Sequence, residues 1–140
     1  MGYRDLKSNV IPTQSLAVTD RTAAASGTAV DTRGYDSAMF VLETGALSDG
    51  VWTFVPQESD TTTDGDFGAV DAGDLDGTLP TVSGNTSPVT GANALTRISY
   101  KGSKRYLRVR VTVASAPSPT VGAVIGGHIL LGHPHQAAIA

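Results

Sequence analysis

The chain has 140 residues, a net charge of -3 at pH 7 and no cysteine. This length suits one domain that buries a core of its own, and the lack of cysteine excludes disulfides and thiolate metal sites. The N-terminal residues alternate in polarity and lead into no long apolar run, which argues against a signal peptide or a membrane span. We therefore expect a single domain over residues 1–140 that is made in the cytoplasm and has no membrane contact.

The charges are separated into blocks along the chain. Between Gly34 and Thr96 there are ten acidic residues and no Lys or Arg, and no acidic residue follows Asp76. Basic residues gather in one later stretch: Arg97, Lys101, Lys104, Arg105, Arg108 and Arg110. Such segregation suits complementary protein surfaces, either within one chain or between chains.

The first half of the chain predicts an arm or edge strand, a hairpin and a loop. Residues 1–33 have few large apolar groups and predict either an extended N-terminal arm that a partner completes or an edge strand after a disordered lead. Residues 38–43 and 51–57 are rich in aromatic and branched side chains, and the Asp-Gly turn signal between them predicts a hairpin. The stretch 58–77, rich in Asp, Thr and Gly, predicts a long acidic loop outside the core.

Strand signals continue towards the C-terminus. Residues 95–100 and 105–113 are strand-like, and the short Gly-containing segment between them predicts a second hairpin. Shorter runs occur at residues 15–19, 67–70, 78–82 and 121–131. Helical periodicity free of Gly and Pro is absent from the sequence. The pattern predicts an all-β fold of about eight short antiparallel strands, at the spacing typical of sandwiches and barrels.

Residues 105–113 have the clearest alternation. Apolar side chains recur at every second position from Leu107 to Val113, so the residues between them face away from the core. The candidates for a protein interface are therefore Tyr106, Arg108 and Arg110, with Arg105 at the strand mouth. We expect these arginines to meet carboxylates, either of a partner or of the chain's own acidic loop. The alternative is a solvent-facing strand whose charges only prevent edge-to-edge aggregation.

Two clusters raise the question of metal binding. The acids from Asp60 to Asp76 supply oxygen ligands but lack the register of a calcium loop. His133 and His135 could hold zinc or iron, but no acidic residue follows to complete a cupin-type site. The chain also has no catalytic Cys, no Gly-x-Ser-x-Gly elbow and no cofactor motif, so we predict no enzyme, no metal and no cofactor. Its overall acidity argues against nucleic acid as a partner.

Several segments together resemble a known protein family. They are Asp5-Leu6-Lys7-Ser8-Asn9, Val30-Asp31, Gly34-Tyr35-Asp36-Ser37-Ala38, Gln57-Glu58-Ser59-Asp60, Phe67, Asp74-Leu75-Asp76-Gly77 and Lys101-Gly102-Ser103-Lys104-Arg105-Tyr106-Leu107-Arg108. Over most of its length the chain is similar to capsid cement, or decoration, proteins of tailed phages. The resemblance implies a jelly-roll-like β-sandwich that sits as a homodimer on the outer surface of the virion and links neighbouring major capsid protein subunits. It brings no catalytic residues.

Two other functions remain open from the sequence. One is a carbohydrate-binding or adhesin-like β-sandwich module in which Trp52, Tyr100 and Tyr106 stack on sugars. A buried Trp52 would count against that module, and we expect Trp52 and Phe54 to pack in the core. The other is a phage head-to-tail connector or tail-tube subunit, which would form closed rings in place of dimers.

Overall fold

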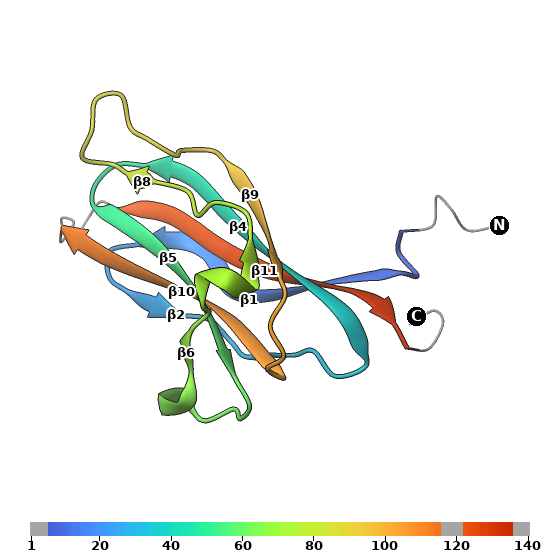
Figure 1. Ribbon diagram of the computed structural model, residues 1–140. Helices are drawn as coiled ribbons and strands as arrows, with labels where there is room; N and C mark the ends of the chain where they lie inside the picture. Colours follow the sequence, from blue (N-terminus) through green and yellow to red (C-terminus); the bar gives the residue numbers. More distant parts are fainter. Residues whose placement is uncertain (1–5, 116–121, 136–140) are drawn as a thin grey trace.

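The computed structural model describes residues 6–115 and 122–135, which form a β-sandwich of two antiparallel sheets (Figure 1). The all-β prediction is thereby confirmed. The elements follow one another as β1 Val10–Arg21, β2 Ala25–Ser26, β3 Val30–Asp31, β4 Tyr35–Leu47, β5 Val51–Ser59, η1 Asp64–Asp66, β6 Gly68–Ala69, η2 Ala72–Asp74, β7 Leu75–Asp76, β8 Val82–Ser83, β9 Leu95–Tyr100, β10 Tyr106–Ser115 and β11 Ala123–Pro134.

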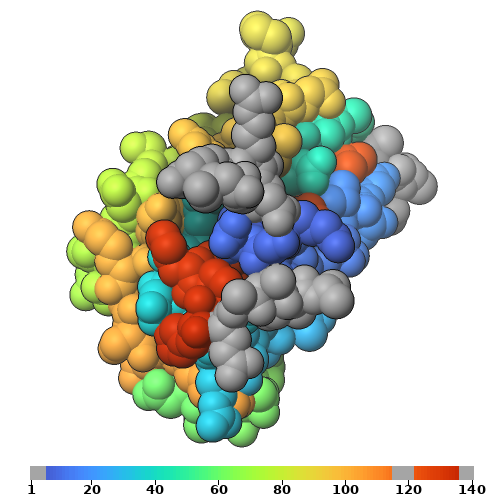
Figure 2. All heavy atoms as spheres, turned by 90° about the vertical axis from the view of Figure 1, so that its right-hand side faces the viewer, coloured from blue at the N-terminus to red at the C-terminus, as the bar shows by residue number. Residues whose placement is uncertain are grey.

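Each sheet draws its strands from both halves of the chain. The first, here named the β1 sheet, has the order β1-β11-β4-β9-β7. The second, the β10 sheet, has the order β2-β10-β5-β6, with β3 also paired to β10 and β8 to β5. Strands β1, β4 and β11 have 12, 13 and 12 residues, longer than the short strands expected from the sequence. Figure 2 looks onto the end of the molecule where the N-terminal and C-terminal residues, blue and red, lie side by side.

The core lies between the two sheets because each long strand turns alternate side chains inward. Trp52 is 2% exposed and Phe54 1%, so their predicted core packing is confirmed. The other buried apolar residues are Leu16, Val30, Phe40, Leu42, Leu47, Val70, Val82, Ile98, Leu107, Val109, Val111, Ala123, Ile125, Ile129 and Leu131. Gly127 lies where a Cβ would come within 2.7 Å of the Val109 side chain, so a larger residue there would push the sheets apart.

The two predicted hairpins are wrong. Residues 38–43 lie in β4 and residues 51–57 in β5, and these strands belong to different sheets. Likewise β9 pairs with β4, whereas β10 pairs with β5. A loop of a few residues crosses the gap of about 10 Å between packed sheets as readily as it joins neighbouring strands. Alternation reports which side chains face inward, but it does not say which strand is the neighbour.

Most of the 1–33 stretch belongs to the sandwich. β1 pairs with β11 from Val10 to Arg21, and its Leu16 is 2% exposed, so the edge-strand alternative describes this part of the chain better than a free arm. Residues 1–5 lie outside the described residues. The β1 ladder is irregular after Gln14, and there the Ser15 hydroxyl donates to the carbonyl of Thr28 at 2.8 Å and accepts the Val109 amide at 2.9 Å. Ser15 thus ties β1 to the opposite sheet.

The acidic stretch 58–77 passes from one sheet to the other. Its strand β6 pairs with β5, and β7 pairs with β9. The expectation that it contributes nothing to the core is wrong at two positions, because Val70 is 8% exposed and Leu75 packs against the core cluster. These isolated apolar residues enter the sandwich where the chain crosses its edge, whereas the surrounding carboxylates stay in water.

Candidate protein-interaction surface

The predicted interface residues lie on β10, which runs between β5 on one side and β2 and β3 on the other. Every second side chain at the start of β10 is completely buried between the sheets: Leu107, Val109 and Val111. The outer face of the strand therefore carries Tyr106, Arg108 and Arg110, as the alternation predicted. Arg105 directly precedes the strand, also as predicted.

Arg108 is covered by the chain's own acidic segment. Only 7% of the residue is exposed. Its guanidinium carbon lies 4.2 Å from the ring centre of Phe67, Nη1 donates to Asp64 Oδ1 at 2.5 Å, and Nε donates to Gln57 Oε1 at 2.7 Å. The hydrogen bond from Arg108, together with its charge, lowers the pKa of the Asp64 carboxyl. Strand β10 thus holds the η1 turn against the outer face of its sheet.

Arg105 and Arg110 also have partners within the chain. Arg105 makes two hydrogen bonds to the carboxylate of Asp31, at 3.0 and 2.9 Å, and its guanidinium lies 4.9 Å from the ring centre of Tyr106. The hydrogen bond from Arg105 lowers the pKa of Asp31. Arg110 Nη1 donates to Ser26 Oγ of β2 at 2.6 Å. Because the side chains of Arg105 and Asp31 are 43% and 42% exposed, this pair adds little to stability.

These contacts bear on the two possibilities that the sequence left open, because Arg108 meets the chain's own acidic loop and Arg105 meets an acid outside that loop. Their carboxylate partners are Asp31 and Asp64 of the same chain, so a carboxylate of another protein would have to displace them or bind beside them. The outer face of the β10 sheet is consequently a mixed-charge surface whose side chains are already held in place. A docking role for Arg105, Tyr106, Arg108 and Arg110 stays a prediction.

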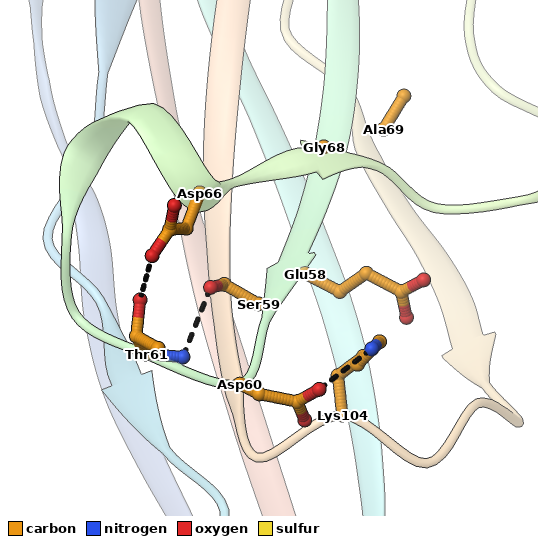
Figure 3. A pocket seen from close by; sticks show the side chains of 8 residues that line it. All are labelled: Glu58, Ser59, Asp60, Thr61, Asp66, Gly68, Ala69 and Lys104. Carbon is orange, nitrogen blue, oxygen red and sulfur yellow. Dashed lines mark hydrogen bonds and ion pairs between the residues drawn. The ribbon is translucent and has the colours of Figure 1, made fainter.

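A shallow pocket of about 420 Å³ lies at the end of β5 (Figure 3). It is lined by Glu58, Ser59, Asp60, Thr61, Asp66, Gly68, Ala69 and Lys104. Lys104 Nζ is 2.6 Å from Asp60 Oδ2, and the Thr61 hydroxyl donates to Asp66 Oδ2 at 2.6 Å (Figure 3). The pocket carboxylates are therefore engaged by neighbouring side chains, which order this end of the acidic segment.

Tyr100 and Glu58 join the two sheets beside this pocket. The Tyr100 hydroxyl, from β9, donates to Glu58 Oε2 of β5 at 2.5 Å and accepts the backbone amide of Lys104 at 2.9 Å. Burial, followed by the hydrogen bond to Glu58, raises the pKa of Tyr100, so the hydroxyl keeps its proton at physiological pH. This contact fixes the loop that carries the chain from β9 to β10.

The two histidines considered for metal binding have separate polar partners. His133 Nδ1 is hydrogen-bonded with the hydroxyl of Ser37, and His135 Nε2 lies 2.6 Å from Asp36 Oδ1. Within residues 6–115 and 122–135, no three His, Asp or Glu side chains are placed so that they could hold a metal ion. The structure therefore brings neither the histidines nor the acids of the 58–77 stretch together as a metal centre in this part of the chain.

The three aromatic residues considered for sugar stacking, Trp52, Tyr100 and Tyr106, do not form an exposed platform. Trp52 is buried, and its indole N–H donates to the backbone carbonyl of Asp49 at 2.9 Å. Tyr100 is tied to Glu58, and the Tyr106 ring is partly covered by Arg105. These positions count against the carbohydrate-binding alternative, which relied on Trp52 as its largest stacking group.

Sequence reasoning missed three residues that surround Arg108. Gln57 lies directly opposite it in the β5–β10 ladder, whereas Asp64 and Phe67 reach it from the acidic segment. Gln57 could not be found without knowing that β5 and β10 are neighbours. Phe67 did give a signal, because it is the sole aromatic residue between positions 58 and 77 and a lone aromatic in a polar run usually packs on something.

Comparisons with known proteins add no assignment to this surface. In the described part of the chain, no helix is long and apolar enough to cross a membrane. No protein family model, curated protein or solved structure matches the sequence or the fold of this chain.

Proposed function

We propose that this chain is a structural cement protein of a phage head. It binds the outer surface of the capsid as a homodimer and links neighbouring major capsid protein subunits. The observation that carries the proposal is the path of the chain through the sandwich, taken together with the sequence segments that resemble phage cement proteins.

The path of the chain supports a jelly roll. The main strands have the order β1-β11-β4-β9 in one sheet and β2-β10-β5-β6 in the other. The chain changes sheet from β4 to β5, from β9 to β10 and again from β10 to β11, and the first and last long strands are neighbours. Jelly rolls are the architecture of many viral capsid domains, lectins and cupins. Since fold alone does not assign function, the resemblance to cement proteins selects among these classes.

The outer face of the β10 sheet supports a role in binding protein. Arg105, Arg108 and Arg110 are each held by a side chain of the same molecule, which lowers the entropy that docking would cost. A protein that binds only the assembled shell stabilises it by the binding free energy at every occupied site. A binding free energy of ~3 to 8 kcal/mol per site, repeated over many copies, is enough to resist outward pressure from packaged DNA.

An electron cryomicroscopy map of virions that carry this chain tests the proposal. We expect density with the shape of the sandwich on the outside of the shell, in contact with more than one major capsid subunit. Density inside the neck or along the tail would favour the connector or tail-tube alternative. Purified virions that lack the chain altogether would refute a structural role in the particle.

A further inference from the structure

The outer faces of the two sheets differ in chemistry. The outward positions of β10 carry charges, as described above, whereas those of the β1 sheet include a group of apolar residues bordered by Gln14, His128 and Ser99. Met39 and Leu130 are directly opposite each other on β4 and β11, and Pro12 of β1 is opposite Leu130 in the same row. Val41 follows Met39 on the outward side of β4, and Val10 stands two positions before Pro12 on β1. We name these five residues the outer apolar face.

The outer apolar face is contiguous. In the same strands, the side chains of Phe40, Leu42 and Ile129 point into the core and are at most 1% exposed, so their neighbours must point outward. Met39, Val41, Leu130 and Val10 are partly exposed and Pro12 is exposed. Beside them Gly132 has no side chain, and a depression of about 310 Å³ lies between Val10, Met39, Ser99, Leu130 and His133.

In an antiparallel sheet that has one face in water, the side chains on that face are normally polar. Single apolar residues on a surface need no explanation, but a patch that spans three neighbouring strands marks a place where another protein binds. The missing side chain at Gly132 leaves a hollow in the patch. A Cβ at this position would meet only Ser37 and Asn9, at ordinary contact distances of 3.8 and 3.9 Å, so the space is open.

The rim of the face indicates which protein binds. Arg97 is exposed opposite Val41 and forms no ion pair with any of the described residues, and Glu43 lies on the same face of neighbouring β4, 4.0 Å from His128 Nδ1. A two-fold interface requires one patch to be complementary to itself. The outer apolar face has Arg97 on one side of Val41 and His128, which contacts Glu43, on the other, so both signs of charge border its apolar residues. It meets this requirement, since Arg97 of one copy can pair with Glu43 of the other.

We propose that the outer apolar face is the surface through which a second copy of this chain binds. The inference rests on the homodimer of the proposed function and assigns it to the outer face of the β1 sheet. The mixed-charge outer face of the β10 sheet then stays free for the shell. In such a dimer the two β1 sheets pack against each other and the two β10 sheets face in opposite directions.

Analytical ultracentrifugation through the micromolar range tests this with two matched variants. Val41→Lys and Val55→Lys each replace a partly buried, outward-facing valine that lies opposite an arginine, on β4 and on β5 respectively. We expect wild type and Val55→Lys to sediment as dimers, and Val41→Lys to dissociate with a dimer Kd raised at least ~30-fold. Circular dichroism melting verifies that both variants fold. A monomeric wild type, or a Val41→Lys dimer as tight as wild type, overturns the proposal.

The reciprocal ion pair allows a second test that does not depend on Val41. Arg97→Glu and Glu43→Arg should each weaken their own dimers, because like charges then meet twice across the interface. An equimolar mixture of the two variants should form a heterodimer near the wild-type Kd, because every pair becomes attractive again. No recovery on mixing overturns the assignment of these two residues.

Shell binding separates this inference from the cement function. Isolated shells are incubated with each variant, and the bound protein is measured after sedimentation. If Val41→Lys is monomeric but still binds shells, the result supports both the outer apolar face as the dimer interface and the cement function. The proposal is overturned if wild type is monomeric in solution and Val41→Lys alone abolishes shell binding. The outer apolar face would then bind the capsid protein and not a second copy of this chain.

Discussion

Removing the Arg108 side chain should destabilise the sandwich more than removing any other residue of the candidate interface. Arg108→Ala loses the hydrogen bond to Gln57, a term of about 1 kcal/mol, and the contact with the Phe67 ring, about 0.5 to 1 kcal/mol. It also uncovers the apolar surface under its side-chain stem. The ion pair with Asp64 adds little because the Asp64 side chain is 86% exposed and solvent screens the pair.

The terms for Arg108→Ala add to roughly 2 to 3 kcal/mol, or a fall in Tm of about 6 to 10 °C for a domain of this size. Arg108→Met keeps the stem and an aromatic contact, so it should cost less than half as much. Arg110→Ala is the matched control on the same face of β10, because Arg110 is more exposed and its side chain has one hydrogen bond to the described residues, with Ser26. Thermal melting followed by circular dichroism measures all three variants.

The pH dependence of the Arg108 variants gives an independent check. The pKa of Asp64 is lowered in the folded protein, so the contribution of its pair with Arg108 is present above the ordinary aspartate value of 3.8 and is lost as pH falls through the folded value. The difference in Tm between wild type and Arg108→Met should therefore shrink in acid. If Arg108→Ala has the same Tm as wild type, or if Arg110→Ala lowers Tm as much as Arg108→Ala does, the structural role argued for Arg108 is wrong.

Three further substitutions probe contacts between the sheets. Ser15→Ala leaves the buried Val109 amide without its hydroxyl acceptor and should lower the free energy of unfolding by about 1 to 3 kcal/mol in urea titrations. Gly127→Ala forces a Cβ against the Val109 side chain, and overpacking should cost about 1 to 3 kcal/mol in the same assay. Tyr100→Phe removes the hydroxyl that joins β9 to Glu58 and should lower Tm by a few degrees, equivalent to ~1 kcal/mol.

Matched substitutions at open positions are the controls for these three variants. Ser48 is exposed, and a Cβ at Gly65 would meet nothing within 4 Å, so Ser48→Ala and Gly65→Ala should stay within about 0.5 kcal/mol of wild type. A loss for these controls as large as for Ser15→Ala or Gly127→Ala would contradict the packing argument. An unchanged Tm for Tyr100→Phe would mean that the hydroxyl does not hold the sheets together at that end.

The inward and outward faces of the strands were predictable, but the strand neighbours were not. The alternation of Leu107, Val109 and Val111 fixes which side of β10 is buried, because side chains on a strand repeat every two residues. Pairing depends on contacts between residues far apart in the sequence, such as Val109 with Pro56 or Ile98 with Phe40. The loops at both expected hairpins have lengths that allow either pairing or a change of sheet, so local signals favoured the wrong choice.

The acidic stretch shows the same limit for the candidate site. Its composition correctly predicts exposed carboxylates, and the expected contact with an arginine is found for Asp64, whereas Asp60 pairs with Lys104. Which acid meets Arg108 depends on how the chain from β5 to β6 folds back over the β10 sheet, and that path is set by the β5–β6 pairing and by Phe67. Spacing along the sequence carries no information on either contact.

The partners of the arginines change what a docking experiment on this strand means. Had Arg108 and Arg110 been free, loss of shell binding in an Arg108→Ala/Arg110→Ala double variant would have reported lost contacts with shell carboxylates. Because Arg108 holds the η1 turn through Asp64 and Phe67, the same double variant also releases that turn. We therefore expect it to lower Tm through Arg108. Because Arg110 is bonded to the hydroxyl of Ser26 and to no carboxylate of the described residues, we expect its loss to make the salt dependence of docking shallower. A changed salt dependence of docking together with an unchanged Tm would mean that both Arg108 and Arg110 contact the shell directly.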